Sequence, residues 1–129
     1  MADSKSPARK RTIMVVDDSP DLVEIVRITL ESKGFAVRCA YDGPQAFDVL
    51  RKQWPDLILL DIMMPMMDGF EVLTRLKCNP ATASIPVILL TAKRQPEDVI
   101  EGYKRGAEIY IKKPVNNTEL LQGINSILN

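Results

Sequence analysis

The 129-residue sequence contains no histidine, two cysteines and one tryptophan. The lack of histidine excludes Ser-His-Asp and Cys-His catalytic groups, as well as zinc sites built on imidazole. Cys39 and Cys78 are far apart in sequence and lack metal-ligand spacing, so we expect two reduced, structural thiols. A metal site in this chain would therefore have to use oxygen ligands.

The sequence also lacks net charge and long apolar segments. Seventeen basic residues balance seventeen acidic ones, and no apolar run approaches the ~20 residues that span a bilayer. We therefore expect no direct nucleic-acid binding, no membrane insertion and a cytoplasmic location. Residues 1–11 are basic but lack the apolar core of a secretory signal. They are predicted to form a flexible basic tail before a single domain at 12–129.

Short apolar runs bounded by turn residues predict the strands. The clearest covers residues 57–60, which are all Leu or Ile, and ends in Asp61 before a loop with Pro65 and Gly69. Such a run is typical of a strand buried on both faces. Further strands are predicted at 12–16, 35–40, 85–90 and 109–111. An acid at the exit of a buried strand costs stability unless a cation, a proton or hydrogen-bond donors meet it.

Apolar residues at helical spacing, together with capping residues, predict a helix after each of these strands. Ser19-Pro20 marks the start of the first helix and Gly34 its end. Further helices are predicted from Asp42 to about Trp54, over 68–77, over 95–105 and over 116–128. Trp54 is expected to pack against the domain, because it stands at the end of an amphipathic helix. Gly102 lies inside the fourth helix and weakens it by ~1 kcal/mol relative to Ala, so we expect this helix to be mobile.

The alternation of about five strands with about five helices predicts an α/β fold with a parallel sheet covered on both faces. Right-handed crossovers favour the doubly wound arrangement. In open sheets of this class, ligands bind outside the carboxyl ends of the strands.

The residues at those predicted strand ends suggest phosphoryl chemistry. They are three carboxylates, a hydroxyl and an ammonium: Asp17, Asp18, Asp61, Thr91 and Lys113. Three close carboxylates would repel one another without a cation, and oxygen ligands with room for water suit Mg²⁺ better than a dedicated Ca²⁺ cage. An added lysine and hydroxyl would bind a phosphoryl group, with Asp61 as the nucleophile that forms an acyl phosphate.

The order and spacing of several short motifs resemble the receiver domains of two-component response regulators, from about Thr12 to the C-terminus. These motifs are Asp17-Asp18, Asp61 with Pro65 and Gly69, Thr91-Ala92, Tyr110 and Lys113-Pro114. The resemblance implies the flavodoxin-like (β/α)5 fold with strand order 2-1-3-4-5.

The resemblance also implies an acceptor and a metal site. Asp61 would accept a phosphoryl group from a histidine kinase or a histidine phosphotransfer protein. Asp18, Asp61 and the backbone carbonyl of Met63 would hold Mg²⁺, for which Mn²⁺ could substitute, while Asp17 would act mainly through a metal-bound water. Such a domain is a signalling switch and not an enzyme, since it catalyses only its own phosphoryl transfer and autodephosphorylation.

Phosphoryl contacts and switch residues follow from the same resemblance. Lys113 and the backbones of Met63 and Ala92 would contact the phosphoryl group, and the Lys113-Pro114 bond would be cis. Thr91 would swing toward the phosphate and Tyr110 would turn inward. A downstream protein would then bind the face formed by segment 93–105, the last strand and the last helix. We also predict that the Met63 side chain shields the acyl phosphate from water.

Other interpretations of the sequence remain open. An aspartyl-nucleophile phosphatase of the haloacid-dehalogenase type would need a second Asp two residues after Asp61, where this chain has Met63. A flavodoxin-like redox protein would need a phosphate-binding loop after the first strand, where the chain has Asp-Asp-Ser-Pro. A receiver that no longer accepts phosphate would not need the full set of acids, hydroxyl and lysine. The chain ends with its last predicted helix, so it is either a free-standing regulator or a part of a longer transcription factor or signalling enzyme.

Overall fold

One parallel sheet of five strands forms the centre of the computed structural model, which describes residues 10–92 and 96–129. The strands are β1 (Thr12–Val16), β2 (Ala36–Ala40), β3 (Leu57–Asp61), β4 (Val87–Thr91) and β5 (Ile109–Lys112). Their order in the sheet is β2-β1-β3-β4-β5, and each neighbouring pair is parallel. The predicted α/β class, flavodoxin-like topology and strand order are confirmed.

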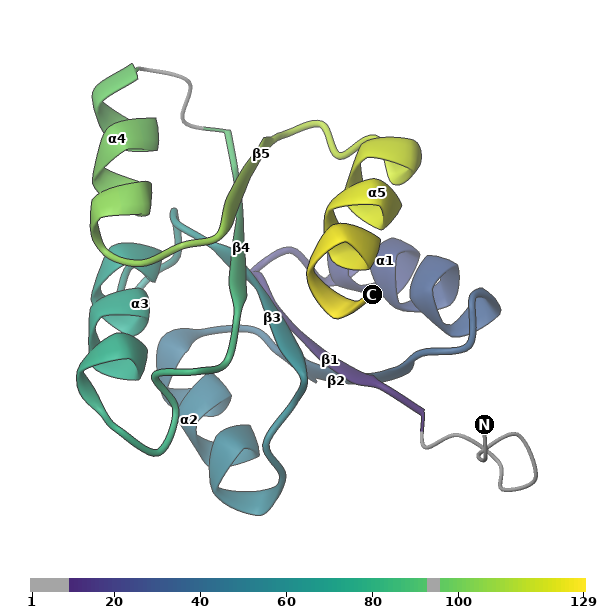
Figure 1. Ribbon diagram of the computed structural model, residues 1–129, viewed down its shortest axis with the longest axis horizontal. Coiled ribbons are helices and arrows are strands. Elements are labelled where there is room, and N and C mark those ends of the chain that lie inside the picture. The colour runs from purple at the N-terminus through teal and green to yellow at the C-terminus, as the bar shows by residue number, and fades with distance from the viewer. Residues whose placement is uncertain (1–9, 93–95) are drawn as a thin grey trace.

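Five helices cover the sheet on both faces. They are α1 (Pro20–Ser32), α2 (Gly43–Lys52), α3 (Gly69–Cys78), α4 (Pro96–Lys104) and α5 (Asn117–Leu128). Figure 1 shows α1 and α5 on one face and α2, α3 and α4 on the other. No helix within the described ranges is long and apolar enough to cross a membrane.

The central strands separate two apolar cores. In β3 the side chains of Ile58 and Leu60 pack in the core beneath α2 and α3, whereas Leu57 and Leu59 pack in the core beneath α1 and α5. Because successive side chains of a strand point to opposite faces, a strand covered on both sides must be apolar at every position. Full burial of each such side chain contributes about 1.5–3 kcal/mol, which explains the continuous apolar runs in the sequence.

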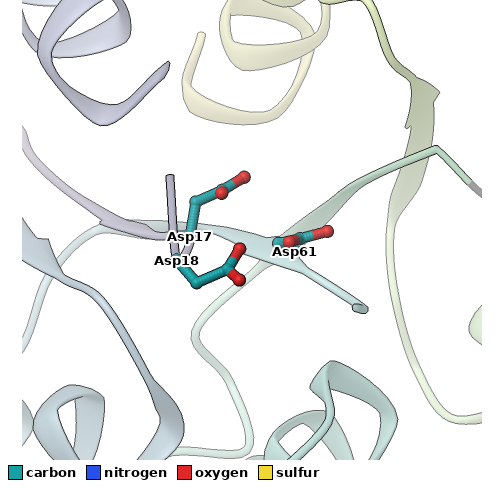
Figure 2. Close-up of side chains that lie close together, drawn as sticks. All are labelled: Asp17, Asp18 and Asp61. Carbon is teal, nitrogen blue, oxygen red and sulfur yellow. The ribbon is translucent and has the colours of Figure 1, made fainter. Parts of the chain in front are cut away.

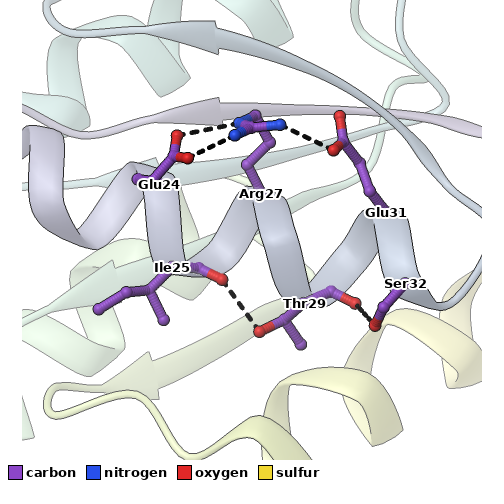
Figure 3. A network of polar contacts seen from close by, with 6 residues as sticks. All are labelled: Glu24, Ile25, Arg27, Thr29, Glu31 and Ser32. Atoms are coloured by element: carbon purple, nitrogen blue, oxygen red, sulfur yellow. Dashed lines mark hydrogen bonds and ion pairs between the residues drawn. The ribbon is translucent and has the colours of Figure 1, made fainter.

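Polar side chains set the starts of the helices. Ser19, Asp42, Asp68 and Asn116 each accept a hydrogen bond from a backbone N–H three residues further on, at 2.8–3.3 Å. The predicted starts of these four helices are confirmed. Gly34, with φ of +94°, follows α1 in the left-handed conformation that ends many helices. On the solvent side of α1, Arg27 bonds both Glu24 and Glu31 (Figure 3).

The structure corrects the prediction for Trp54. This side chain is 60% exposed, so the expectation that it packs into the domain is wrong. Helix α2 ends at Lys52, and Gln53 is already extended, with φ of −160° and ψ of 129°. Trp54 therefore lies beyond the last helical turn and does not follow the apolar face of α2.

The structure also gives Gly102 a packing role. A Cβ atom at this position would lie 2.7 Å from Leu89 Cδ1 and 3.3 Å from the Tyr110 ring, so the glycine allows α4 to approach the sheet. At the end of α4, Arg105 Nη1 donates a hydrogen bond to Thr74 Oγ1 at 2.9 Å, which ties this end to α3. The predicted start of this helix at residue 95 lies outside the described residues, as do positions 1–9 of the predicted tail.

Gly69 allows the closest backbone contact between α3 and the end of β3. A Cβ atom there would lie 2.2 Å from the Asp61 carbonyl oxygen, and the Gly69 N–H donates to the Ile62 carbonyl at 2.7 Å. We expect Gly69→Ala to lower the free energy of unfolding by about 3 kcal/mol, the upper end of the overpacking range, because only backbone movement relieves this clash. Urea unfolding monitored by circular dichroism measures the change.

Gly123→Ala provides the matched control. The nearest atom to a Cβ at that position of α5 is Ile109 Cδ1, at an ordinary 3.4 Å. Alanine should therefore raise stability by up to ~1 kcal/mol through its helix propensity. Equal effects of the two substitutions would contradict a steric role for Gly69.

Candidate functional site

Three carboxylates meet at the carboxyl ends of β1 and β3. Asp17 and Asp18 directly follow β1, and Asp61 is the last residue of β3. One oxygen from each lies within 4.8 Å of the others, and Figure 2 shows the three side chains gathered in one place. Asp17 and Asp61 are buried, whereas Asp18 is exposed. The sheet therefore brings together acids that are more than forty positions apart in sequence.

Asp17 is held from two sides. Its Oδ1 accepts a hydrogen bond from the Ser19 N–H at 2.9 Å, and its Oδ2 lies 2.7 Å from Lys113 Nζ. Lys113 is thus the charged partner of this buried Oδ2, while the Ser19 N–H meets the other oxygen of the carboxylate. The start of α1 thus fixes both the turn after β1 and the direction of the Asp17 carboxylate.

Lys113 brings one positive charge to the acids. Its Nζ lies 2.7 Å from Asp17 and 3.5 Å from Asp61 Oδ2, and its backbone N–H donates to the Thr91 carbonyl at 2.8 Å. Burial lowers the pKa of Lys113, but the two carboxylates outweigh this effect and leave the pKa above its ordinary value. Lys113 is therefore charged at neutral pH. The Lys113–Pro114 peptide bond is cis, as the resemblance implied.

Asp61 carries a strongly perturbed carboxyl group. Burial raises the pKa of Asp61 to about 6, and the Asp17 carboxylate adds to the rise. Lys113 and the N–H of Met63, which donates to Asp61 Oδ1 at 3.3 Å, act in the opposite direction but do not cancel it. The site therefore holds more negative charge than Lys113 neutralises.

Thr91 and Tyr110, the two residues predicted to act as a switch, lie on the neighbouring strands β4 and β5. Thr91 is buried at the end of β4, the strand next to β3, and Ala92 follows it as an exposed residue. Tyr110 is partly buried on β5 and packs against the core beneath α2 and α3. Burial, with a smaller effect from Asp98 of α4, raises the pKa of the Tyr110 hydroxyl. Lys93, two residues beyond Thr91, lies outside the described residues.

Sequence reasoning missed two backbone contributions to this site. Ser19 was predicted only as a helix cap, yet its N–H also positions Asp17. Gly69 was predicted as a loop residue and as part of the Asp61 motif, but not as the residue whose missing side chain allows the contact with the Asp61 carbonyl. The Ser19 contact is a local turn in which the Asp17 side chain accepts from the backbone two residues on, so the residue types could have suggested it. The Gly69 contact depends on the path of the chain in space.

The donor set fits a hard divalent cation. Three carboxylates against one lysine leave excess negative charge. Burial is the main cause of the raised pKa of Asp61, and the Asp17 carboxylate adds to it. Carboxylate oxygens are the ligands that Mg²⁺ prefers, and an exposed Asp18 leaves room for water on the solvent side.

Comparison with known proteins identifies the family. The family model described as "Response regulator receiver domain" matches residues 13–125. The chain belongs to this family. Receiver domains are signalling domains of two-component systems, so the chain is assigned to phosphorylation-controlled signalling.

Curated relatives of this receiver domain are about twice its length. It is 40% identical over 116 residues to the DNA-binding dual master transcriptional regulator RpaA of Synechocystis, covering 90% of this chain and 48% of the relative. It is 39% identical over 119 residues to the DNA-binding response regulator MtrA of Mycolicibacterium smegmatis, covering 92% of this chain and 51% of the relative. The chain thus spans about half the length of these proteins.

Solved receiver structures match nearly the whole chain. The chemotaxis protein CheY4 of Vibrio cholerae superimposes with a TM-score of 0.87 at 32% identity, covering 93% of this chain and all of that one. The N-terminal domain of a response regulator receiver protein from Methanoculleus marisnigri has a TM-score of 0.74 at 44% identity, with 91% and 95% of the two chains covered. Both likenesses support the receiver fold assigned above.

The raised pKa of Asp61 predicts how metal-free stability depends on pH. Its pKa is about 6 in the folded protein and 3.8 in its ordinary state, so the folded state binds the proton more tightly. The wild type should therefore lose up to about 3 kcal/mol relative to Asp61→Asn as the pH rises from about 4 through 6. The loss is absent below about pH 4 and complete above about pH 6. Urea unfolding of both proteins with EDTA, at several pH values across this window, measures it.

A constant stability difference between wild type and Asp61→Asn over this pH range would contradict the assigned shift. Gly123→Ala is the control, because it changes no titratable group. Its effect on stability should be the same at every pH in this series.

Proposed function

We propose that Asp61 accepts a phosphoryl group, with Mg²⁺ bound beside it, and that this phosphorylation switches the domain. The observation that carries the proposal is the convergence of three carboxylates and Lys113 at one buried end of the sheet. If these buried charges served only to stabilise the fold, apolar residues of similar size would stabilise it equally well or better.

Asp18 and Asp61, with the backbone carbonyl of Met63, would hold the metal, and Asp17 would act on it through water. Bound Mg²⁺ would neutralise charge on the phosphoryl oxygens, a function that Mn²⁺ could also serve. Lys113 already lies between Asp17 and Asp61, so its ammonium can pair with a phosphoryl oxygen after small side-chain movement. The backbones of Met63 and Ala92 would supply further hydrogen bonds.

The proposed donor is a phosphohistidine on a histidine kinase or a histidine phosphotransfer protein. An Asp61 carboxylate oxygen attacks the phosphorus atom, the phosphorus–nitrogen bond breaks, and the histidine nitrogen keeps the electron pair. Hydrolysis of the resulting acyl phosphate returns Asp61 and inorganic phosphate. The transfer needs positioning and charge neutralisation rather than a general base, which agrees with the absence of histidine from the sequence.

Phosphorylation would be read out on the face formed by α4, β5 and α5. The acyl phosphate carries nearly two negative charges where the Asp61 carboxylate carried one, and the adjoining Thr91 and Lys113 would move in response. Tyr110 links this end to α4, because its ring lies against Gly102. Ile100 and Tyr103 are large exposed side chains on α4 and would contact a downstream protein. A full reversal of a 1:99 equilibrium needs ~5.5 kcal/mol, so we expect a partial population shift.

A second arrangement agrees with the relatives. RpaA and MtrA are named as DNA-binding and are about twice as long as this chain. If the chain is the receiver part of such a regulator, the same face would control an attached output domain. Both versions use the same acceptor and switch residues.

Acetyl phosphate provides the direct test. Incubation with Mg²⁺ should add one phosphoryl group to the wild type, because Asp61 is a preformed nucleophile. Asp61→Asn should gain none, and omission of Mg²⁺ should abolish labelling of the wild type. Intact-mass spectrometry measures the products. Equal labelling of wild type and Asp61→Asn would show that Asp61 is not the acceptor.

Met63 should control the lifetime of the acyl phosphate. Its side chain is 54% exposed and lies two residues after Asp61, where an apolar group can shield the phosphorus atom from water. We expect Met63→Asn to speed autodephosphorylation several-fold, since an amide can bind and orient the attacking water. Loss of the phosphoryl group over time, followed by mass spectrometry, gives the rate.

Met66→Asn is the matched control for this prediction. Met66 lies on the same loop, is 81% exposed and has φ of 72°, a conformation that Asn tolerates. Its substitution should leave the rate unchanged. An unchanged rate in Met63→Asn would overturn the shielding role.

A further inference from the structure

A groove runs between α2 and α3, outside the acidic group. It has a volume of about 550 Å³, within the range of sites that take a ligand or several anchoring side chains. Figure 1 shows α2 and α3 side by side on the same face of the sheet. Its walls come from α2, the segment after it, and the loops on either side of α3: Pro44, Phe47, Leu50, Trp54, Met67 and Thr82.

The inner surface of this α2–α3 groove combines apolar and polar side chains, and the apolar ones lie along α2 and the loop after β3. Leu50 is buried, and Phe47 and Met67 are partly buried and pack against the core of this layer. Trp54, the only tryptophan of the chain, is 60% exposed beside them. A tryptophan left mostly in water next to an apolar wall is a large area that a bound molecule could cover.

Two arginines carry positive charge at the edge of the groove, one from each helix. Arg51 pairs with Asp48, and Arg75 pairs with Glu71 at 2.8 Å. Both pairs lie within one helix and are exposed, so they contribute little and can exchange partners. Asp48 also lines the groove, so the two arginines there face one acid and leave an excess of positive charge for carboxylates on a bound molecule.

The length of the groove favours an extended occupant. Pro44, the second residue of α2, and Trp54, which follows the helix, both line it. The groove therefore runs along most of α2, whose ten residues rise about 15 Å along the helix axis. A short amphipathic helix matches this length better than a compact small molecule. Exposed tryptophan and arginine are also the residue types that most often dominate the energy of protein interfaces.

We infer that the α2–α3 groove binds an acidic amphipathic helix of a partner protein. Apolar side chains at i, i+3 or i+4, and i+7 of that helix would pack on Trp54, Phe47 and Met67. Carboxylates flanking them would pair with Arg51 and Arg75. This surface is separate from the phosphorylation site and from the α4–β5–α5 face, so the inference does not rest on the proposed function.

Met67 connects the groove to the loop that follows Asp61. Its Sδ lies 2.9 Å from the position that a Cβ of Gly43 would occupy, so Met67 packs directly on the start of α2. A helix bound in the groove would contact this loop. The affinity of the groove for this helix would therefore depend on the position of the loop after β3.

The test uses the full 129-residue protein and a phage library of 16-residue helical peptides. Selection should enrich peptides with apolar residues at helical spacing and nearby Asp or Glu. A synthetic copy of an enriched peptide should shift the emission of Trp54 to shorter wavelength as the indole leaves water. Absence of enrichment over a scrambled library would overturn the inference.

Variants locate the binding surface. Trp54→Ala and the double variant Arg51→Glu, Arg75→Glu should each weaken binding of the peptide by about tenfold or more, measured by fluorescence anisotropy. These side chains are exposed, so both variants should fold, which circular dichroism checks. Ile25→Ala on α1 and Ile100→Ala on α4 remove equally exposed apolar side chains and should leave affinity unchanged.

Three results would overturn the inference. The first is a peptide that binds Trp54→Ala within about twofold of the wild type. The second is equally tight competition by 2-naphthoate, which would indicate a small-molecule site. The third is self-association of the protein that Trp54→Ala abolishes, measured by sedimentation, which would indicate a second copy as the occupant.

Discussion

The structure depends on how negative charge is held at the end of a buried strand. Asp61 is the last residue of the wholly buried β3, and Asp17 lies near it at the end of β1. Lys113, which follows β5, supplies a positive charge that lies close to both carboxylates. Burial and, secondly, the Asp17 carboxylate raise the pKa of Asp61, and one lysine leaves the three acids short of positive charge. The proposed binding of a divalent cation, and then of a phosphoryl group, would relieve this imbalance.

Strands and helices around the three acids connect them to the surface of the domain. Lys113 follows β5 and bonds the end of β4 through the Thr91 carbonyl, while Gly69 sets α3 directly against the Asp61 carbonyl. Tyr110 lies on β5 between this end of the sheet and α4. Asp61 therefore lies next to residues that contact α3 on one side and α4 on the other, and both helices reach the surface.

The layer that contains α2, α3 and α4 has two distinct surfaces. Exposed Ile100 and Tyr103 mark α4, where the switch is expected to be read, and Trp54 with Arg51 and Arg75 marks the α2–α3 groove. The loop after Asp61 borders the groove through Met67, whereas Tyr110 approaches α4 from β5. One phospho-acceptor could thus influence two partner sites by different routes.

The sequence by itself determined the class of fold, the strand order through family resemblance, and the residues at the carboxyl ends of the strands. It could do so because apolar runs, caps such as Ser19 and Asn116, and the strand-end acids are local patterns. Only the tertiary structure decided that Trp54 faces solvent, that Gly102 and Gly69 are needed for close packing, and that Lys113 lies between Asp17 and Asp61. The exposure of Trp54 depends on where α2 ends. The other features depend on how closely segments distant in sequence approach one another, and a short stretch of residues does not specify that approach.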